Sequence, residues 1–203
     1  MPTIHGLLSY ISDIDKLEAQ NIASFLPSKS DLNIIENRLG NLLLYPQTIP
    51  ETAEESLFDI AVLKEMLRLE PNSFYSSNLK KIYIPENIAQ ICPNLSKLAF
   101  IFIDALKPRN LTSLQLKSKN LGVKNLGTYI KPENISDECF LDVCIGKQKF
   151  HVLAGNIVII PVSQQKIDIR LESNCNITEG KNEFMAEVIG GDIGIIIDLC
   201  QQN

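Results

Sequence analysis

Asp142 and His151 are the two residues whose types and spacing could do acid–base chemistry together. They lie in the apolar-alternating segments FLDVCI and QKFHVL, which flank Gly146-Lys147. A two-residue Gly-X loop between such segments predicts a β-hairpin, and in that hairpin Asp142 is the direct cross-strand neighbour of His151. A carboxylate beside an imidazole is the orienting half of a catalytic triad. The same pair on a solvated sheet face is more often a plain surface ion pair.

The hairpin also predicts which side chains are buried. Ile145 should pair with Gln148, so that the core side carries Leu141, Val143, Phe150 and Val152. A pocket that contains Asp142 and His151, with a Ser or Cys in reach, would favour a small-ligand site or a minor hydrolase.

A glycine cluster near the end of the chain is a second candidate ligand site. Gly190, Gly191 and Gly194 could bring backbone amides close to an anion, whereas a tight turn into a buried last strand is the simpler interpretation. Asp198, inside the apolar run IIIDL, lies either at the wet end of that strand or in hydrogen bonds to the backbone. Asp104 in FIFIDAL poses the same question.

Charge and composition exclude several partners and cofactors. The net charge is −5 and no basic run is longer than Lys80-Lys81, so a nucleic-acid surface is not expected. The five cysteines form no C-x-x-C pair and the two histidines are far apart, so we expect no metal, no cofactor and reduced, mostly buried thiols. The first 15 residues do not resemble a signal peptide, and no stretch is apolar enough to span a membrane, which predicts a cytoplasmic protein.

The first part of the chain predicts helices. A segment over 13–26 should stop at Pro27, and a second helix capped by Ser30 should end before Gly40. The next helix could start at Thr48 or Thr52, each of which has a Glu three residues later, and we favour Thr52. One face of that helix should be buried, and the opposite face, which carries three acids, should be solvated. The buried face consists of Leu57, Ile60, Leu63 and Leu67, and the acids are Glu55, Asp59 and Glu65.

The later part of the chain predicts strands. KKIYIP over 80–85 is a short strand, and NLSKLAFIFIDAL over 94–106 is a capped apolar helix. Short apolar runs then recur about every ten residues. KIDIRL over 166–171 alternates, whereas IVIIPV over 157–162 does not and should be covered on both faces. We therefore predict an α+β fold, with a helical region over 1–108 and an antiparallel β-rich domain over 109–203 that is a sandwich or barrel-like.

Three strings resemble a known family in its own order. They are the run from FLPSKSDL to LKEMLR, the segment FIFIDALKPRNLTSLQLKSKNLGVKNLG, and GGDIGIIID near the C-terminus. Together they resemble the MutL family associated with glutamate mutase, over about residues 20–199. Longer members of that family resemble actin-like ATPases and begin with a phosphate loop of the D-x-G-[ST]-T type, which this sequence does not contain.

The resemblance therefore implies only the C-terminal portion of such a protein. It implies a non-catalytic accessory or interaction module, without ATPase activity of its own, which has a protein partner. The chain would be either a shortened relative or one half of a split protein whose partner supplies the nucleotide-binding lobe. The alternative is a small-ligand-binding β-domain or a minor hydrolase that uses Asp142 and His151.

Overall fold

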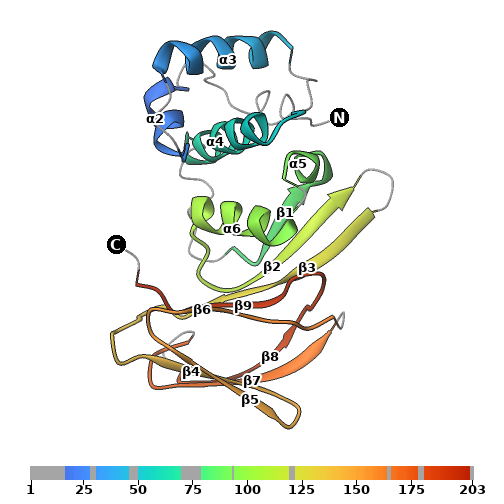
Figure 1. Ribbon diagram of the computed structural model, residues 1–203. Helices are drawn as coiled ribbons and strands as arrows, with labels where there is room; N and C mark the ends of the chain where they lie inside the picture. Colours follow the sequence, from blue (N-terminus) through green and yellow to red (C-terminus); the bar gives the residue numbers. More distant parts are fainter. Residues whose placement is uncertain are drawn as a thin grey trace. The chain divides into compact units, whose positions relative to one another are not determined.

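The computed structural model divides the chain into a helical unit and a β unit (Figure 1). It describes residues 17–27, 31–45, 50–69, 79–92, 94–118, 122–163, 166–177 and 181–201. The helical unit contains α2 (Ala19–Ser24), α3 (Leu32–Leu44), α4 (Ala53–Leu69), α5 (Glu86–Ile91) and α6 (Leu95–Leu106). Residues 13–16, where we expected the first helix to begin, and the expected cap Ser30 lie outside the described residues.

Side-chain caps fix where the main helices begin. At α4, the Glu55 amide donates to Thr52 Oγ1 over 3.1 Å, and the Thr52 amide donates back to Glu55 Oε2 over 3.1 Å. This is the capping box that the sequence predicts at Thr52. Asn94 caps α6 as expected, through a 3.0 Å bond from the Lys97 amide.

Helix α3 differs from the prediction at its C-terminal end. It begins at an Asp31 cap and runs through Gly40 to Leu44. The prediction that Gly40 follows the end of the helix is therefore wrong. Interior glycine costs a helix only about 1 kcal/mol, and Ile35, Leu39 and Leu42 are buried along the same helix. Burial of that stripe on both sides of Gly40 outweighs the local preference for a stop.

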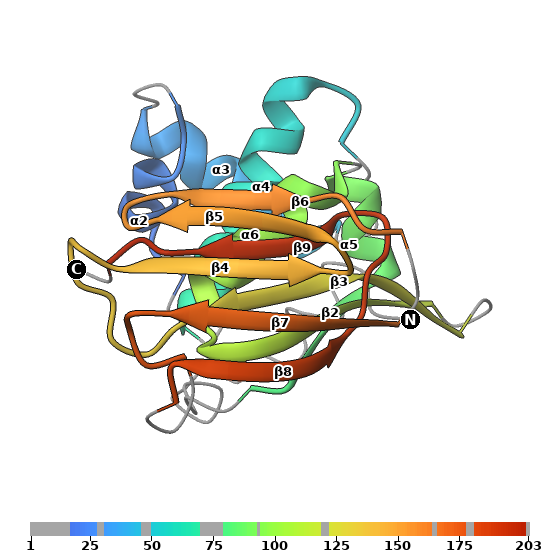
Figure 2. The same cartoon turned by 90° about the horizontal axis from the view of Figure 1, so that it is seen from below.

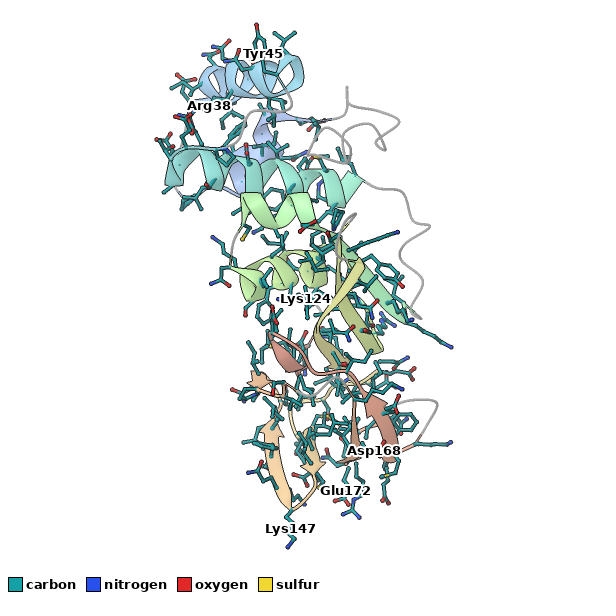
Figure 3. All side chains as sticks on the ribbon, turned by 90° about the vertical axis from the view of Figure 1, so that its right-hand side faces the viewer. Arg38, Tyr45, Lys124, Lys147, Asp168 and Glu172 are labelled. Carbon is teal, nitrogen blue, oxygen red and sulfur yellow. A yellow bond between two sulfur atoms is a disulfide. The ribbon has the colours of Figure 1, made fainter. Side chains whose placement is uncertain are left out.

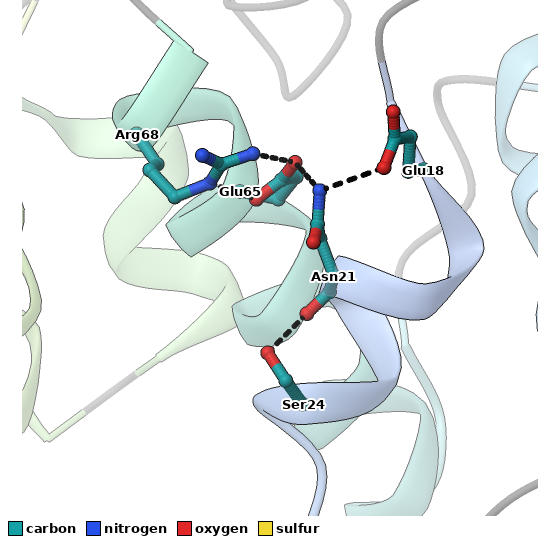
Figure 4. Close-up of polar contacts among 5 residues, drawn as sticks. All are labelled: Glu18, Asn21, Ser24, Glu65 and Arg68. Carbon is teal, nitrogen blue, oxygen red and sulfur yellow. Dashed lines mark hydrogen bonds and ion pairs between the residues drawn. The ribbon is translucent and has the colours of Figure 1, made fainter.

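Helix α4 is buried on nearly all sides, which corrects the expectation of one solvated face. Asp59 and Glu65, which we expected on the solvated face, are both buried. Glu65 accepts from Arg68 Nε over 2.6 Å and from Asn21 Nδ2 over 3.0 Å (Figure 4). The Asn21 bond links α2 to α4, so this acid is a structural clamp within the helical unit. Helix α4 also packs against α6, as the apolar character of both helices predicts.

Two sheets form the β unit (Figure 2). One sheet has the order β1-β2-β3-β9-β6 and the other β5-β4-β7-β8. Their bounds are β1 (Lys81–Pro85), β2 (Asn110–Ser118), β3 (Gly122–Lys131), β4 (Phe140–Ile145), β5 (Gln148–Leu153), β6 (Ile157–Ile160), β7 (Ile167–Ser173), β8 (Glu183–Val188) and β9 (Gly194–Asp198). The sheets are not closed, so the fold is α+β with a sandwich and not a barrel. The expectation of purely antiparallel pairing is wrong for β3 and β9, which are parallel.

The core of the β unit consists of alternate residues from both sheets. Ile169 and Leu171 of β7 face inward, as the alternation of KIDIRL predicts. They pack in one cluster with Leu141 and Val143 of the hairpin and with Ile195 of β9. None of the described helices is long and apolar enough to cross a membrane.

Cys139 and Cys175 form a disulfide bond, which corrects the expectation that the thiols are reduced. Their Cα atoms are 5.8 Å apart, a separation that disulfides normally span. The bond closes a loop across a sequence separation of 36 residues. Of the described cysteines, Cys92, Cys144 and Cys200 are free.

Candidate functional site

The β4–β5 hairpin places Asp142 opposite His151, as the sequence predicts. Ile145 pairs with Gln148, and the register continues through Asp142 and His151. Gly146 has φ +57°, the left-handed conformation that a Gly-X turn requires at its first position. The one-residue precision of this turn fixes which side chains share the outer face of the sheet.

Both oxygens of the Asp142 carboxylate are occupied by cationic or imidazole partners. Asp142 Oδ1 lies 2.6 Å from His151 Nδ1, and Asp142 Oδ2 lies 2.9 Å from Lys149 Nζ. Burial alone would raise the pKa of Asp142, but the hydrogen bonds from His151 and Lys149 outweigh it and lower that pKa. The same contact with Asp142 raises the pKa of the Lys149 ammonium. The carboxylate is therefore stabilised as an anion and is poorly suited to accept a proton.

Further charges extend this arrangement across the outer face of the sheet. Glu172 lies on β7 and Lys147 at the hairpin turn (Figure 3). Lys149 Nζ lies 3.7 Å from Glu172, which in turn pairs with Arg170 over 2.5 Å. Acids and bases thus alternate over β5, β4 and β7. Asp142 is only 6% exposed, which corrects the expectation that this pair lies on a fully solvated face.

Cys144 is the nucleophile that this face offers to the hydrolase alternative. It lies on β4 two residues after Asp142, and its cross-strand partner on β5 is Lys149. His151 is therefore its diagonal neighbour, a position about 7–8 Å away in a regular sheet. A nucleophile and its base need about 2.6–3.2 Å. Cys139 is unavailable to this chemistry because it forms the disulfide bond.

The glycine cluster brings backbones close together within its own sheet. A Cβ on Gly191 would lie 2.3 Å from the Asn125 carbonyl oxygen, and one on Gly194 would lie 2.3 Å from the Ile160 carbonyl oxygen. The Gly191 amide already donates to the Val162 carbonyl over 2.9 Å. Gly190 is buried beside them. These contacts give the glycines a packing role that does not involve an anion.

Asp198 takes the hydrogen-bonded alternative. Its Oδ2 accepts from Tyr129 Oη over 2.6 Å and from Lys131 Nζ over 2.8 Å, and its Oδ1 accepts from the Cys200 amide over 2.8 Å. Burial would raise the pKa of Asp198, but these bonds outweigh it and lower that pKa. Burial, followed by the bond to Asp198, raises the pKa of Tyr129. The cluster joins the end of β9 to β3. Asp104 of α6, in contrast, is exposed.

Strand β6 is exposed along its outer face, which corrects the expectation that it is covered on both faces. Ile157 is 48% exposed and Ile159 40%. The Leu199 amide donates to the Asn156 carbonyl over 2.9 Å, so this residue pair is hydrogen-bonded. Along two antiparallel strands, residue pairs that are joined by backbone hydrogen bonds alternate with pairs that are not. The peptide groups of Ile157 and Ile159 therefore point away from β9, toward the open edge of the sheet.

Comparison with models of known protein families, with curated proteins and with solved structures finds no match. The interpretation therefore rests on the residues themselves. Among the described residues, no group of three His, Cys, Asp or Glu side chains could hold a metal ion.

Sequence reasoning missed the burial of Asp59, which lines a pocket in the helical unit. The signal was present in the neighbouring sequence. Apolar residues surround Asp59 on all sides of the helix, as in FDIAVLKEML, and a helix that is apolar all round is buried.

Proposed function

We propose that this chain is a non-catalytic interaction module that binds an extended segment of a partner protein along the edge of β6. The open edge of β6 is the observation that carries the proposal. The peptide groups of Ile157 and Ile159 supply hydrogen-bond partners for an added strand, and their exposed side chains supply apolar contact area.

A comparison of the four sheet edges supports this choice of strand. Proteins protect open edges with charged side chains or proline. Strand β1 has Lys81 and Pro85, β5 has Lys149, and β8 has Glu183 and Glu187. Strand β6, with the sequence IVII, has neither charge nor proline. The edge that lacks this protection is the one suited to accept a strand.

The resemblance to the C-terminal portion of MutL-type proteins favours a partner other than a second copy. The longer members of that family also contain a nucleotide-binding lobe. We infer that a protein with a lobe of that type is the partner. A cytoplasmic location stays a prediction, and the disulfide bond counts against it because the cytosol keeps most thiols reduced.

Site-specific photocrosslinking tests the proposal. A photoreactive amino acid replaces Ile159 in one chain and Met185, which is 62% exposed on β8, in a control. We expect position 159, but not 185, to crosslink one protein through an extended apolar segment. The purified partner should then bind Ile157→Lys at least tenfold more weakly than the unchanged chain. Crosslinks to a second copy only, or unchanged binding by Ile157→Lys, would overturn the proposal.

The alternative function uses Asp142 and His151. Their 2.6 Å contact favours it, because an oriented imidazole is half of a nucleophilic site. Hydrolysis of p-nitrophenyl acetate by the pure chain would support this function if both Asp142→Asn and Cys144→Ser reduced the rate at least tenfold. Equal rates in all three proteins would argue against it.

A further inference from the structure

A pocket of about 200 Å³ lies between α3 and the start of α4, within the helical unit. Its apolar wall includes Leu42, Pro50 and Phe58, and Tyr45 contributes a second aromatic ring. Arg38 lies on α3, and Tyr45 is the cap residue directly after its C-terminal end (Figure 3). Apolar walls with a few polar groups are typical of small-molecule sites.

Asp59 lines this pocket with a carboxyl group that forms no hydrogen bond and no ion pair with the residues that the structure describes. The residue is only 6% exposed. Burial first, and the nearby Glu55 carboxylate second, raise the pKa of Asp59 to about 6. Buried acids are normally paired or hydrogen-bonded. At neutral pH this carboxylate opens into the pocket, where a ligand could supply a hydrogen-bond donor in place of water.

The other charged groups of the pocket are already engaged. Glu55 Oε2 accepts from the Glu51 and Thr52 amides, over 2.8 Å and 3.1 Å, at the start of α4. Arg38 Nη2 pairs with Glu54 over 2.8 Å. Arg38 is not among the groups that shift the pKa of Asp59, whereas the Glu55 carboxylate is. The lining has an excess of negative charge next to apolar surface.

We propose that this pocket binds a small organic cation, in which an ammonium group pairs with Asp59 and a compact apolar body contacts Phe58 and Leu42. The ammonium would provide a hydrogen-bond donor for the carboxylate, and the face of an aromatic ring attracts a nearby cation. A dry cavity of about 150 Å³ in another protein holds benzene. A volume of about 200 Å³ therefore suits one ring with a short aminoalkyl group. This site is separate from β6 and does not depend on the interaction proposed there.

Three probes of similar size and different charge test the inference. Benzylammonium, benzyl alcohol and benzoate are each titrated into the pure chain and followed by two-dimensional NMR at pH 7.5. We expect saturable binding of benzylammonium, with shifts centred on residues 38–45 and 50–59. Benzyl alcohol should bind at least tenfold more weakly, and benzoate should not bind. Equal binding of all three probes, or no saturable binding of benzylammonium at about 10 mM, a weak-binding limit for so small a fragment, would overturn the inference.

Two variants separate the role of Asp59 from a general charge effect. Asp59→Asn keeps the shape but removes the charge, and should weaken benzylammonium binding at least tenfold. Asp104→Asn removes one charge from an exposed site on α6 and should change binding less than twofold. If Asp59→Asn does not fold, carboxyl NMR of the unchanged chain replaces it. Bound benzylammonium should then lower the Asp59 pKa, and an unchanged titration of Asp59 would refute the pairing.

Discussion

Asp59→Asn should stabilise the protein at neutral pH, because Asp59 is a buried acid that no described residue pairs with. Its pKa is about 6 in the folded chain, against a usual value of 3.8. The folded state therefore holds the Asp59 proton more tightly than the unfolded state does. The stability that the protonated form contributes is fully present below pH 3.8 and is lost as the pH rises through 6.

The size of this effect follows from the pKa difference. One pKa unit is worth about 1.4 kcal/mol, so the shift from 3.8 to about 6 corresponds to about 3 kcal/mol at most. Asparagine cannot ionise and avoids this loss. Its amide is as poorly hydrogen-bonded as the protonated acid, at a cost of about 1–3 kcal/mol that is similar at every pH. The free energy of unfolding of Asp59→Asn, relative to that of the unchanged chain, should therefore rise by about 2–3 kcal/mol between pH 4 and pH 7.5.

Urea unfolding followed by circular dichroism at pH 4 and pH 7.5 measures this difference. The change in unfolding free energy between the two pH values is measured for Asp59→Asn and for the unchanged chain, and the second is subtracted from the first. The contributions of groups that both proteins share, such as Asp142 and Asp198, then cancel. Asp104→Asn, an exposed change of the same charge, should show no such growth. If Asp59→Asn is less stable than the unchanged chain at pH 7.5 but not at pH 4, the Asp59 carboxylate has a stabilising partner. That result would refute the prediction.

Three further predictions concern the core, the buried ion pair and nucleotide. Leu63→Ala should lower the free energy of unfolding by about 2–5 kcal/mol in urea titration, because Leu63 is 1% exposed in α4; a loss below 1 kcal/mol would show that the residue is peripheral. Asp198→Asn should destabilise the β unit by about 3–5 kcal/mol, measured in the same way, because Lys131 would keep a buried charge without its counterion; equal stability would mean that Lys131 finds another acceptor or loses its proton. Calorimetry with ATP and Mg²⁺ should detect no saturable binding by the pure chain, since phosphoryl transfer depends on groups that position the phosphates and its sequence contains no phosphate loop of the D-x-G-[ST]-T type; a measurable Kd would contradict this.

Local chemistry made part of the fold predictable. The Gly146-Lys147 loop alone fixes the register of its hairpin, so the position of Asp142 opposite His151 follows without knowledge of the rest of the chain. The caps at Thr52 and Asn94 are equally local, and both were predicted at the correct residue. These features depend on hydrogen bonds that span only a few residues.

Features that depend on distant neighbours were not predictable. The composition of IVIIPV identifies it as an apolar strand. The position of β6 at the edge of its sheet depends on which strands pair, including the parallel pairing of β3 with β9. The pairing of Cys139 with Cys175 likewise depends on the fold, because the sequence contains no spacing that specifies it. The apolar stripe of α4 predicts one buried face and therefore an exposed Asp59. The burial of Asp59 depends on the elements that pack around the rest of the helix.

Three acids, Asp142, Asp198 and Asp59, differ in how completely their charge is satisfied. Asp142 has partners on both oxygens, and Asp198 has three donors, so each is fully accounted for by the fold. Asp59 is buried and has none in the described part of the chain. Natural folds leave such a group unpaired at a cost, and unsatisfied local rules concentrate at functional sites. The open peptide groups of β6 are the backbone equivalent, because they too lack a partner that the rest of this sheet provides. The Asp142–His151 pair has the residue types of catalysis, but its polar groups are already paired. Asp59 and β6 have polar groups that are still available to bind a ligand or a partner, so we expect the functional sites there.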